Sequence, residues 1–342
     1  MEDNRQILRG GGYSSDHLAW LSTLRGFAAL LVFCSHMTII PAPKDTLFIL
    51  GRIGVVCFFL MTGYLTITSR KRRNWKQYAW NRFLRVYPVY WLLLILMFIV
   101  VYPTHSLKSL LLNITLFEEF LGGDPILGAS WMLPIQVVFF AGVTIVGARF
   151  FVDEVKSEEK NIRRGCLIMA ACMLCSIATG AVRHITGKPF PTAFFLLIAI
   201  SILGIYYWYL DGNLKKLIGI GLVFEISFTI AVALSYPSQI LRYVLSYNIG
   251  IAVFVLFEKC VSGRGWIGKA FSELGKIGFT FFLGAGIPWT LLLKINSFES
   301  PWWMIVMGCT LKFLCAIVLG TIITKHIENP LLKWGRKVEK KQ

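Results

Sequence analysis

Residues 83–102 of the chain read FLRVYPVYWLLLILMFIVVY. Apart from Arg85, the segment has no charged residue. A helix of about twenty apolar residues is long enough to cross the hydrocarbon core of a bilayer, which is about 30 Å thick. The segment therefore predicts a transmembrane α-helix.

The rest of the chain repeats this pattern. Of its 342 residues, 56% are hydrophobic and 15% are charged, whereas soluble domains have about 25% charged residues. This composition excludes a soluble multidomain enzyme, and the apolar content is too high for a disordered chain. We therefore predict an all-α, polytopic membrane protein that forms a single domain over residues 1–342. Ten spans are expected, at residues 20–40, 49–68, 83–102, 130–150, 165–182, 190–210, 217–235, 240–257, 277–295 and 302–324. The apolar segment 107–117 is too short to span and is expected at the membrane interface.

Basic residues are divided unevenly between the two sides that these spans define. The chain has 35 Lys and Arg against 18 Asp and Glu, a net charge of +17, which in a soluble protein would suggest a nucleic-acid partner. Here they lie between the apolar runs: with a cytoplasmic N-terminus, 26 fall in cytoplasmic segments and 5 in outer loops. The positive-inside rule then places both termini in the cytoplasm. We expect membrane lipids, and no nucleic acid, as partners. The five outer residues are Lys44, Lys108, Arg183, Lys188 and Lys294.

The first span carries two ionisable residues, Arg25 and His36. Ionisable groups inside a membrane are costly, so each needs a reason. Their separation of 11 residues is about three helical turns, which places them on one face about 16 Å apart along the axis. This pattern indicates a polar groove that crosses most of the bilayer. The alternative is an arginine that extends to the membrane surface and a histidine that is hydrogen-bonded to a neighbouring carbonyl.

Further charges lie at the mouth of the third span and inside later spans. Arg82 and Arg85 are three residues apart on one helical face, where two guanidinium groups could hold a diphosphate. Anchoring by positive charge explains the same two positions equally well. Three more charged residues lie within spans seven, eight and ten, and a buried ion pair among them is the expected explanation. These residues are Glu225, Arg242 and Lys312.

Five motifs in order along the chain resemble the acyltransferase 3 family, bacterial inner-membrane enzymes that O-acylate surface glycans. Each motif is weak alone, but the five together cover the whole chain in the family's order. They are Arg25-x10-His36, the glycine-rich stretch Gly51–Leu65, Arg82-Phe-Leu-Arg85 with the following Tyr-Pro and Tyr-Trp, Ser130-Trp131-Met-Leu133, and Glu328-Asn-Pro330 after the last span.

The chain departs from the family pattern in two places. The Ser-Trp motif usually leads to a glutamate, but here the following residues 134–137 read PIQV. The ninth span usually carries a histidine before its proline, but residues 282–288 read FLGAGIP. These departures leave the acyl group and the acceptor less defined than the class of reaction.

The resemblance implies transfer of an acetyl or similar short acyl group from cytoplasmic acyl-CoA to a sugar hydroxyl. Arg25, Arg82 and Arg85 would bind the acyl-CoA, and His36 would act as the general base, because imidazole titrates near neutral pH. Ser130 or Trp131 is a candidate donor to the developing oxyanion. No metal is expected. The acceptor would be a polysaccharide or a lipid-linked oligosaccharide, with lipopolysaccharide O-antigen as the leading candidate.

A transporter or flippase of a glycan or acyl carrier is the competing interpretation. Transport would also explain charged residues inside the membrane and a polar groove. It would not require the Arg-x10-His and Arg-x-x-Arg spacings together, and no inverted repeat is visible in the sequence.

Overall fold

A computed structural model of the protein describes most of the chain, and the described residues form helices and connecting turns. The expectation of an all-α polytopic membrane protein is confirmed. Among the described residues, seven helices are long and apolar enough to cross a membrane, and three further apolar helices are shorter. The described residues are 19–36, 44–71, 75–145, 158–188, 190–210, 213–261, 265–292 and 301–339.

Each of the ten predicted spans contains an apolar helix. The ninth span differs from its prediction because it consists of two short helices that meet at Ala285. The helices are α2 (Ala19–Ser35), α3 (Lys44–Lys71), α4 (Trp75–Val101), α6 (Leu133–Ile145), α8 (Glu158–Thr186), α9 (Thr192–Tyr209), α10 (Leu214–Ser235), α11 (Ile240–Cys260), α13 (Gly278–Gly284) with α14 (Gly286–Leu291), and α15 (Trp302–Ile323).

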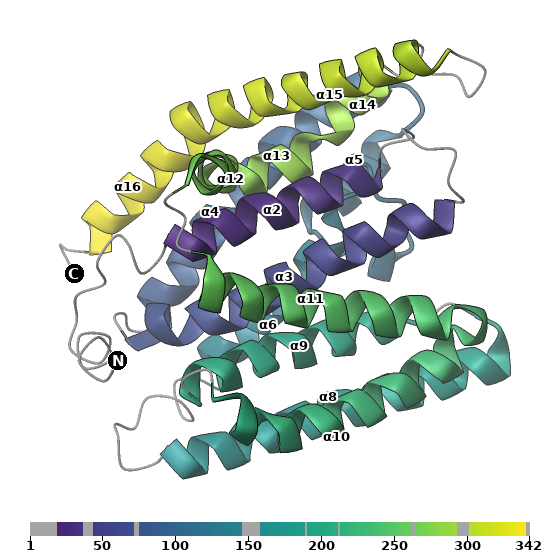
Figure 1. Ribbon diagram of the computed structural model, residues 1–342. Coiled ribbons are helices and arrows are strands. Elements are labelled where there is room, and N and C mark those ends of the chain that lie inside the picture. Colours follow the sequence, from purple (N-terminus) through teal and green to yellow (C-terminus); the bar gives the residue numbers. More distant parts are fainter. Residues whose placement is uncertain are drawn as a thin grey trace.

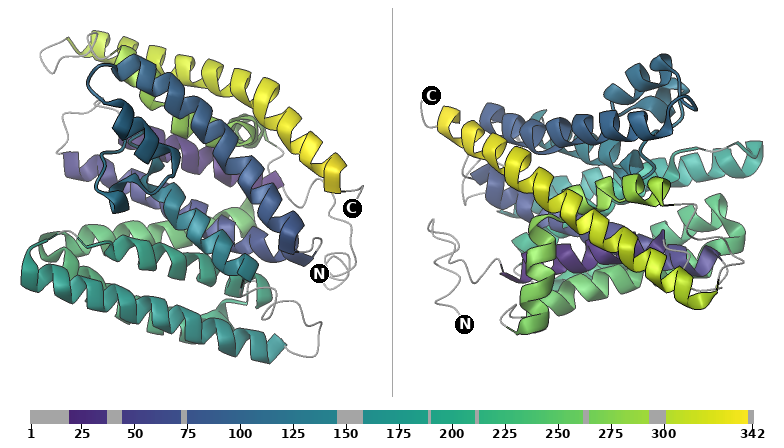
Figure 2. Two further views of the ribbon diagram at one scale, coloured as in Figure 1. Left: turned by 180° about the vertical axis from the view of Figure 1, so that it is seen from behind. Right: turned by 90° about the horizontal axis from the view of Figure 1, so that it is seen from above.

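The helices form a bundle in which one side is built from the C-terminal helices and the other from helices of the middle of the sequence (Figure 1). α15 and its continuation α16 (Asn329–Glu339) cover one side, and α8 and α10 cover the other. α2, α3, α4 and α9 lie between them and carry most of the buried side chains. The start of α2 and the end of α16 lie at the same end of the bundle, as Figure 2 also shows. We call this end the inner end, because the charge pattern predicts that it faces the cytoplasm.

The helix α12 (Trp266–Lys276) lies across the bundle axis at the inner end and was not expected from the sequence. It packs closely on α2. A Cβ atom on Gly26 would collide with the carbonyl oxygen of Phe271, and one on Gly275 would collide with that of Ser22. Two glycines that face each other therefore allow the two backbones to touch.

Residues 107–132, which we call the outer cap, fold over the outer ends of α4 and α6. The cap contains α5 (Leu107–Ile114) and two 3₁₀ turns, η2 (Glu118–Leu121) and η3 (Ser130–Met132). Asn113 is fully buried, and its side chain donates to the carbonyl of Asp124 and accepts from the amide of Ile126, both at 2.9 Å. The Tyr90 hydroxyl of α4 donates to the carbonyl of Asn113 at 2.6 Å. Asn113 thus connects two segments of the cap with each other and with α4.

Candidate functional site

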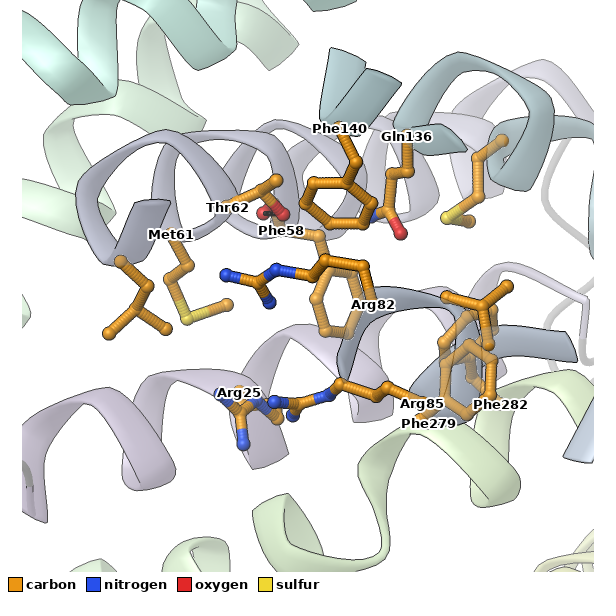
Figure 3. Close-up of a pocket in the computed structure, with 13 residues that line it drawn as sticks. Arg25, Phe58, Met61, Thr62, Arg82, Arg85, Gln136, Phe140, Phe279 and Phe282 are labelled. Carbon is orange, nitrogen blue, oxygen red and sulfur yellow. Dashed lines mark hydrogen bonds between the residues drawn. The ribbon is translucent and has the colours of Figure 1, made fainter. Parts of the chain in front are cut away.

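A cavity of ≈ 80 Å³ lies in the inner half of the bundle, between α2, α3, α4, α6 and α13 (Figure 3). Three arginines line it: Arg25 from α2, and Arg82 and Arg85 from α4. Figure 3 shows the guanidinium groups of Arg25 and Arg85 next to each other, with Arg82 extending into the same space. The remaining lining residues are apolar except for one hydroxyl and one amide: Phe58, Met61, Thr62, Leu65, Val86, Met132, Gln136, Phe140, Phe279 and Phe282.

Local helix geometry explains how the three arginines meet. Arg82 and Arg85 are three residues apart, so they share one face of α4. Arg25 comes from a different helix, and its side chain passes over Gly278 at the start of α13. A Cβ atom at position 278 would lie 3.4 Å from the Cγ atom of Arg25, so glycine at this position leaves the arginine room to extend.

Aromatic rings hold Arg82 in place. Its guanidinium carbon lies 4.6 Å from the ring centre of Phe140 and 5.0 Å from that of Tyr78. Its Nη2 atom also donates to the hydroxyl of Ser69 at 3.3 Å. Cation–π contacts of this kind attract the guanidinium without neutralising its charge. These contacts therefore fix the position of the Arg82 guanidinium.

The positive charge of the cluster is only partly balanced. Within the part of the chain that the structure describes, Arg25, Arg82 and Arg85 form no ion pair. Glu328 is the nearby carboxylate, and it interacts electrostatically with Arg25 and Arg85 without a direct contact. Three cations beside one carboxylate leave an excess of positive charge. Such a cavity attracts an anion.

A distortion at the end of α15 places Glu328 beside this cluster. Residues Thr324–Glu328 form a π-helix, and such wide turns are frequent at functional sites. Glu328 is buried, with 5% of its surface exposed, and it accepts a hydrogen bond from the Thr324 hydroxyl at 3.3 Å. The hydroxyls of Thr324 and Thr280 share a further hydrogen bond at 2.7 Å. The sequence pointed to Glu328 only through the closing motif, without a role.

Gln136 lines the cavity and was missed as a site residue. It lies in the stretch where the family resemblance leads one to expect a glutamate. Gln136 and Phe140 are four residues apart on one face of α6, and Met132, four residues earlier in the preceding turn η3, lines the same cavity. This four-residue spacing is the sequence signal from which Gln136 could have been predicted as a site residue. A neutral amide in place of a carboxylate keeps the cavity more positive.

His36 lies away from this cavity, at the outer end of α2. Its backbone amide donates to the carbonyl of Phe33 at 3.1 Å, and its side chain is exposed. The helix carries Arg25 near its inner end and His36 just beyond its outer end, in agreement with the separation predicted from the sequence. The structure therefore brings Arg25 together with the α4 arginines but not with His36.

Ser130 and Trp131 belong to the outer cap and do not line the cavity either. The Ser130 side chain is fully buried, and its hydroxyl donates to the carbonyl of Leu127 at 2.6 Å and faces Oε1 of Glu118 at 3.2 Å. Trp131 has 37% of its surface exposed. The hydroxyl of Ser130 is thus engaged in bonds within the cap. The catalytic roles of His36, Ser130 and Trp131 stay predictions.

The fold and the cavity define a polytopic membrane protein with an anion-attracting site in the inner half of its helix bundle. The sequence profile of the acyltransferase 3 family, described as an acyltransferase domain, matches residues 18–334. The chain belongs to this family and is a membrane-bound acyltransferase. No curated protein and no solved structure matches it.

The chemistry of the site is that of anion binding. Among the described residues, no three His, Cys, Asp or Glu side chains lie close enough together to hold a metal ion. The groups that the cavity presents are three guanidiniums, one amide, one hydroxyl and several aromatic faces. Guanidinium groups bind phosphate oxygens through two parallel hydrogen bonds. The arrangement suits a ligand with phosphate groups and an apolar portion.

Proposed function

We propose that the protein is a bacterial inner-membrane O-acyltransferase that moves an acetyl or similar short acyl group from cytoplasmic acyl-CoA to a sugar hydroxyl of a surface glycan. The observation that carries this proposal is the cluster of Arg25, Arg82 and Arg85, which line one cavity and have no ion-paired carboxylate among the described residues. Lipopolysaccharide O-antigen is the acceptor to be tested first, since the family resemblance favours it.

The size of the cavity limits which part of acyl-CoA it would hold. Sites for whole small molecules have volumes of about 300–1,000 Å³, whereas this cavity has ≈ 80 Å³. It would therefore take one narrow portion of the donor, either a phosphate group or the pantetheine arm. The nucleotide would lie at the inner surface of the bundle, with its phosphates against Arg82 and Arg85.

The reaction would take place nearer the outer end of α2. A pantetheine arm that passes Arg25 along α2 would lead the thioester towards His36, about 16 Å further along the helix axis. His36 would take the proton of the sugar hydroxyl while the sugar oxygen attacks the thioester carbonyl carbon. The tetrahedral intermediate would then lose the CoA thiolate, which receives that proton from the imidazolium. The products are an O-acyl sugar and free CoA.

Binding and turnover measured separately test this division of roles. In purified protein we expect Arg82→Ala and Arg85→Ala each to weaken binding of radiolabelled acetyl-CoA about tenfold or more, because each removes charge-assisted hydrogen bonds worth about 1.5–3 kcal/mol. His36→Ala should bind acetyl-CoA like the wild type but lose about 10²–10⁴-fold in acetyl transfer. Arg336→Ala, which removes an exposed arginine of α16, is the matched control and should change neither property.

Two results would contradict the proposal. Equal acetyl-CoA affinity in the wild type and in Arg85→Ala would show that the cluster does not bind the donor. Glycan movement across the membrane without acetyl-CoA consumption would show that the competing transport interpretation is right.

A further inference from the structure

Lys312 is a buried cation in the middle of α15 that the proposed mechanism has not used. Only 1% of its surface is exposed. Its Nζ atom lies 4.1 Å from the centre of the Trp289 ring on α14. Within the described residues the ammonium has no ion-paired carboxylate and no hydrogen-bond partner. A lysine in this position is an exception, because intramembrane lysines are normally paired or extend to the surface.

The ion pair expected from the sequence is wrong for this residue. Glu225 of α10 accepts a hydrogen bond from the Asn248 side chain of α11 at 2.9 Å. Both helices lie on the opposite side of the bundle from α15 (Figure 1). Trp289 offers one aromatic face, which replaces only part of the hydration that an ammonium loses on burial. Lys312 therefore keeps an unsatisfied capacity to donate hydrogen bonds.

The position of Lys312 relates it to the outer end of α2. Phe313, its neighbour in the chain, packs on Phe33 of α2 and on Phe281 of α13, with ring centres 5.5 and 5.8 Å apart. His36 is three residues beyond Phe33, just past the last residue of α2, and its amide donates to the carbonyl of Phe33 at 3.1 Å, so His36 lies further towards the outer end. Going outward along α2, the chain therefore passes first Phe33, which contacts Phe313, and then His36.

The side chain of Lys312 extends in the direction that brings its ammonium closer to the depth of His36. α15 starts at the outer end of the bundle, and side chains on a helix lean towards its N-terminus. The ammonium of Lys312 therefore extends outward from its Cα atom, to Trp289 in α14, the outer segment of the broken ninth span. Lys312 and His36 thus both extend towards the outer end of the bundle, from two different helices.

We propose that Lys312 is the cation that binds the thioester carbonyl oxygen and stabilises the negative charge that develops on it. This inference rests on the proposed acyl transfer. While the sugar oxygen forms its bond to the carbonyl carbon and His36 takes the proton, the electron pair of the carbonyl double bond moves to the oxygen. The Lys312 ammonium donates a hydrogen bond to that oxygen. When the C–S bond breaks, the pair returns to form the ester carbonyl.

The test compares Lys312→Met with Lys312→Arg in membrane vesicles whose cytoplasmic face is turned outward. The readout is transfer of radiolabel from acetyl-CoA into the glycan fraction, together with binding of acetyl-CoA. Removing one oxyanion donor typically costs about 10²–10³-fold in turnover. We expect Lys312→Met to lose about 10²-fold in kcat with unchanged acetyl-CoA affinity, and Lys312→Arg to recover part of the rate. Lys269→Met, at an exposed position of α12, makes the same chemical change and should leave kcat unchanged.

Thermal stability separates this role from a structural one. Methionine has nearly the length of lysine and no charge, and replacing an unpaired buried charge by an apolar side chain is often stabilising. We therefore expect Lys312→Met to unfold at the wild-type temperature or above it while its turnover falls. A variant that loses stability and turnover in parallel would overturn the inference, since Lys312 would then only hold the helices together.

The outcomes distinguish this inference from the proposed function. A wild type that transfers label, with Lys312→Met equally fast, overturns the role of Lys312 and leaves the acyltransferase proposal intact. A wild type that binds acetyl-CoA and never transfers label overturns both. A large fall in kcat with intact donor binding and partial recovery by arginine supports both.

Discussion

At the scale of single residues, Glu118 places an ionisable group in the interior of the outer cap. Only 2% of its surface is exposed. Its Oε1 atom faces the Ser130 hydroxyl at 3.2 Å, and its Oε2 atom has no hydrogen-bond partner. Burial raises the pKa of this carboxyl above its usual value, and the hydrogen bond from Ser130 opposes the increase only in part. The folded protein therefore favours the protonated form of Glu118 more than the unfolded chain does.

This pKa shift predicts a stability that depends on pH. Because the folded pKa of Glu118 is raised, its contribution is fully present below the unfolded pKa, about 4.3, and is lost as the pH rises through the folded pKa. Glu118→Gln keeps the shape and cannot ionise. We expect the Gln variant to have a higher Tm than the wild type at pH 8 and the same Tm near pH 4. A Tm difference that does not change with pH would contradict the assignment.

The sequence predicted the positions of the arginines better than the partners of the other charges. Helical spacing alone places Arg82 and Arg85 on one face, and the charge of Arg25 inside a span marked it as functional. That these three meet was a prediction from the resemblance, and the cavity brings them together. The ring of Trp289 over Lys312 could not be predicted, because this contact depends on how two distant helices pack.

At the scale of helices, hydropathy located the spans well and their interruptions poorly. The break at Ala285 lies between Gly284 and Gly286, inside an apolar run that gives no change in hydropathy. The helix α12 lies between the predicted spans 240–257 and 277–295, where hydropathy predicts no span. Phe271 of α12 packs on Phe27 of α2 with ring centres 5.6 Å apart, whereas Trp266 and Ile267 are exposed. The periodicity of apolar residues predicts that a segment is helical, but it does not show which helix the segment packs against.

The contact between α2 and α12 carries its own prediction. A valine at Gly275 would place its Cβ atom against the carbonyl oxygen of Ser22, so the two helices would have to separate. Overpacking of this kind costs about 1–3 kcal/mol. We expect Gly275→Val to lower Tm in detergent and to weaken acetyl-CoA binding, because Arg25 lies next to Gly26 in the contact. Calorimetry or intrinsic fluorescence would measure the first effect, and radioligand binding the second.

The control for this prediction is the same substitution at a glycine with free space. Gly219 of α10 has no atom within 4 Å of its added Cβ. Gly219→Val should therefore leave both Tm and donor binding close to the wild-type values. If Gly275→Val proved as stable as Gly219→Val, α12 would not be held against α2 as the structure describes.

At the scale of the whole molecule, the arginine cavity and His36 lie towards opposite ends of one helix. Arg25 is seven residues into the described part of α2, and His36 follows its last residue. A donor that enters from one side of the membrane would meet the arginine cavity, and an acceptor that arrives from the other side would meet His36. This arrangement depends on which end of the bundle faces the cytoplasm. The charge count predicts the answer, since the expected topology assigns 26 basic residues to the side of the arginines and 5 to the other.

Labelling of single cysteines tests that orientation. In a background that lacks the eight native cysteines, Lys108→Cys and Lys188→Cys should react with a membrane-impermeant maleimide in intact spheroplasts, because both exposed positions lie in predicted outer segments. Lys269→Cys and Lys337→Cys, exposed in α12 and α16, should react only after lysis. Reaction at position 269 in sealed spheroplasts would invert the topology. It would place Arg82 and Arg85 on the side without acyl-CoA, and transfer across the bilayer would then fail as a mechanism even though the chain belongs to the acyltransferase 3 family.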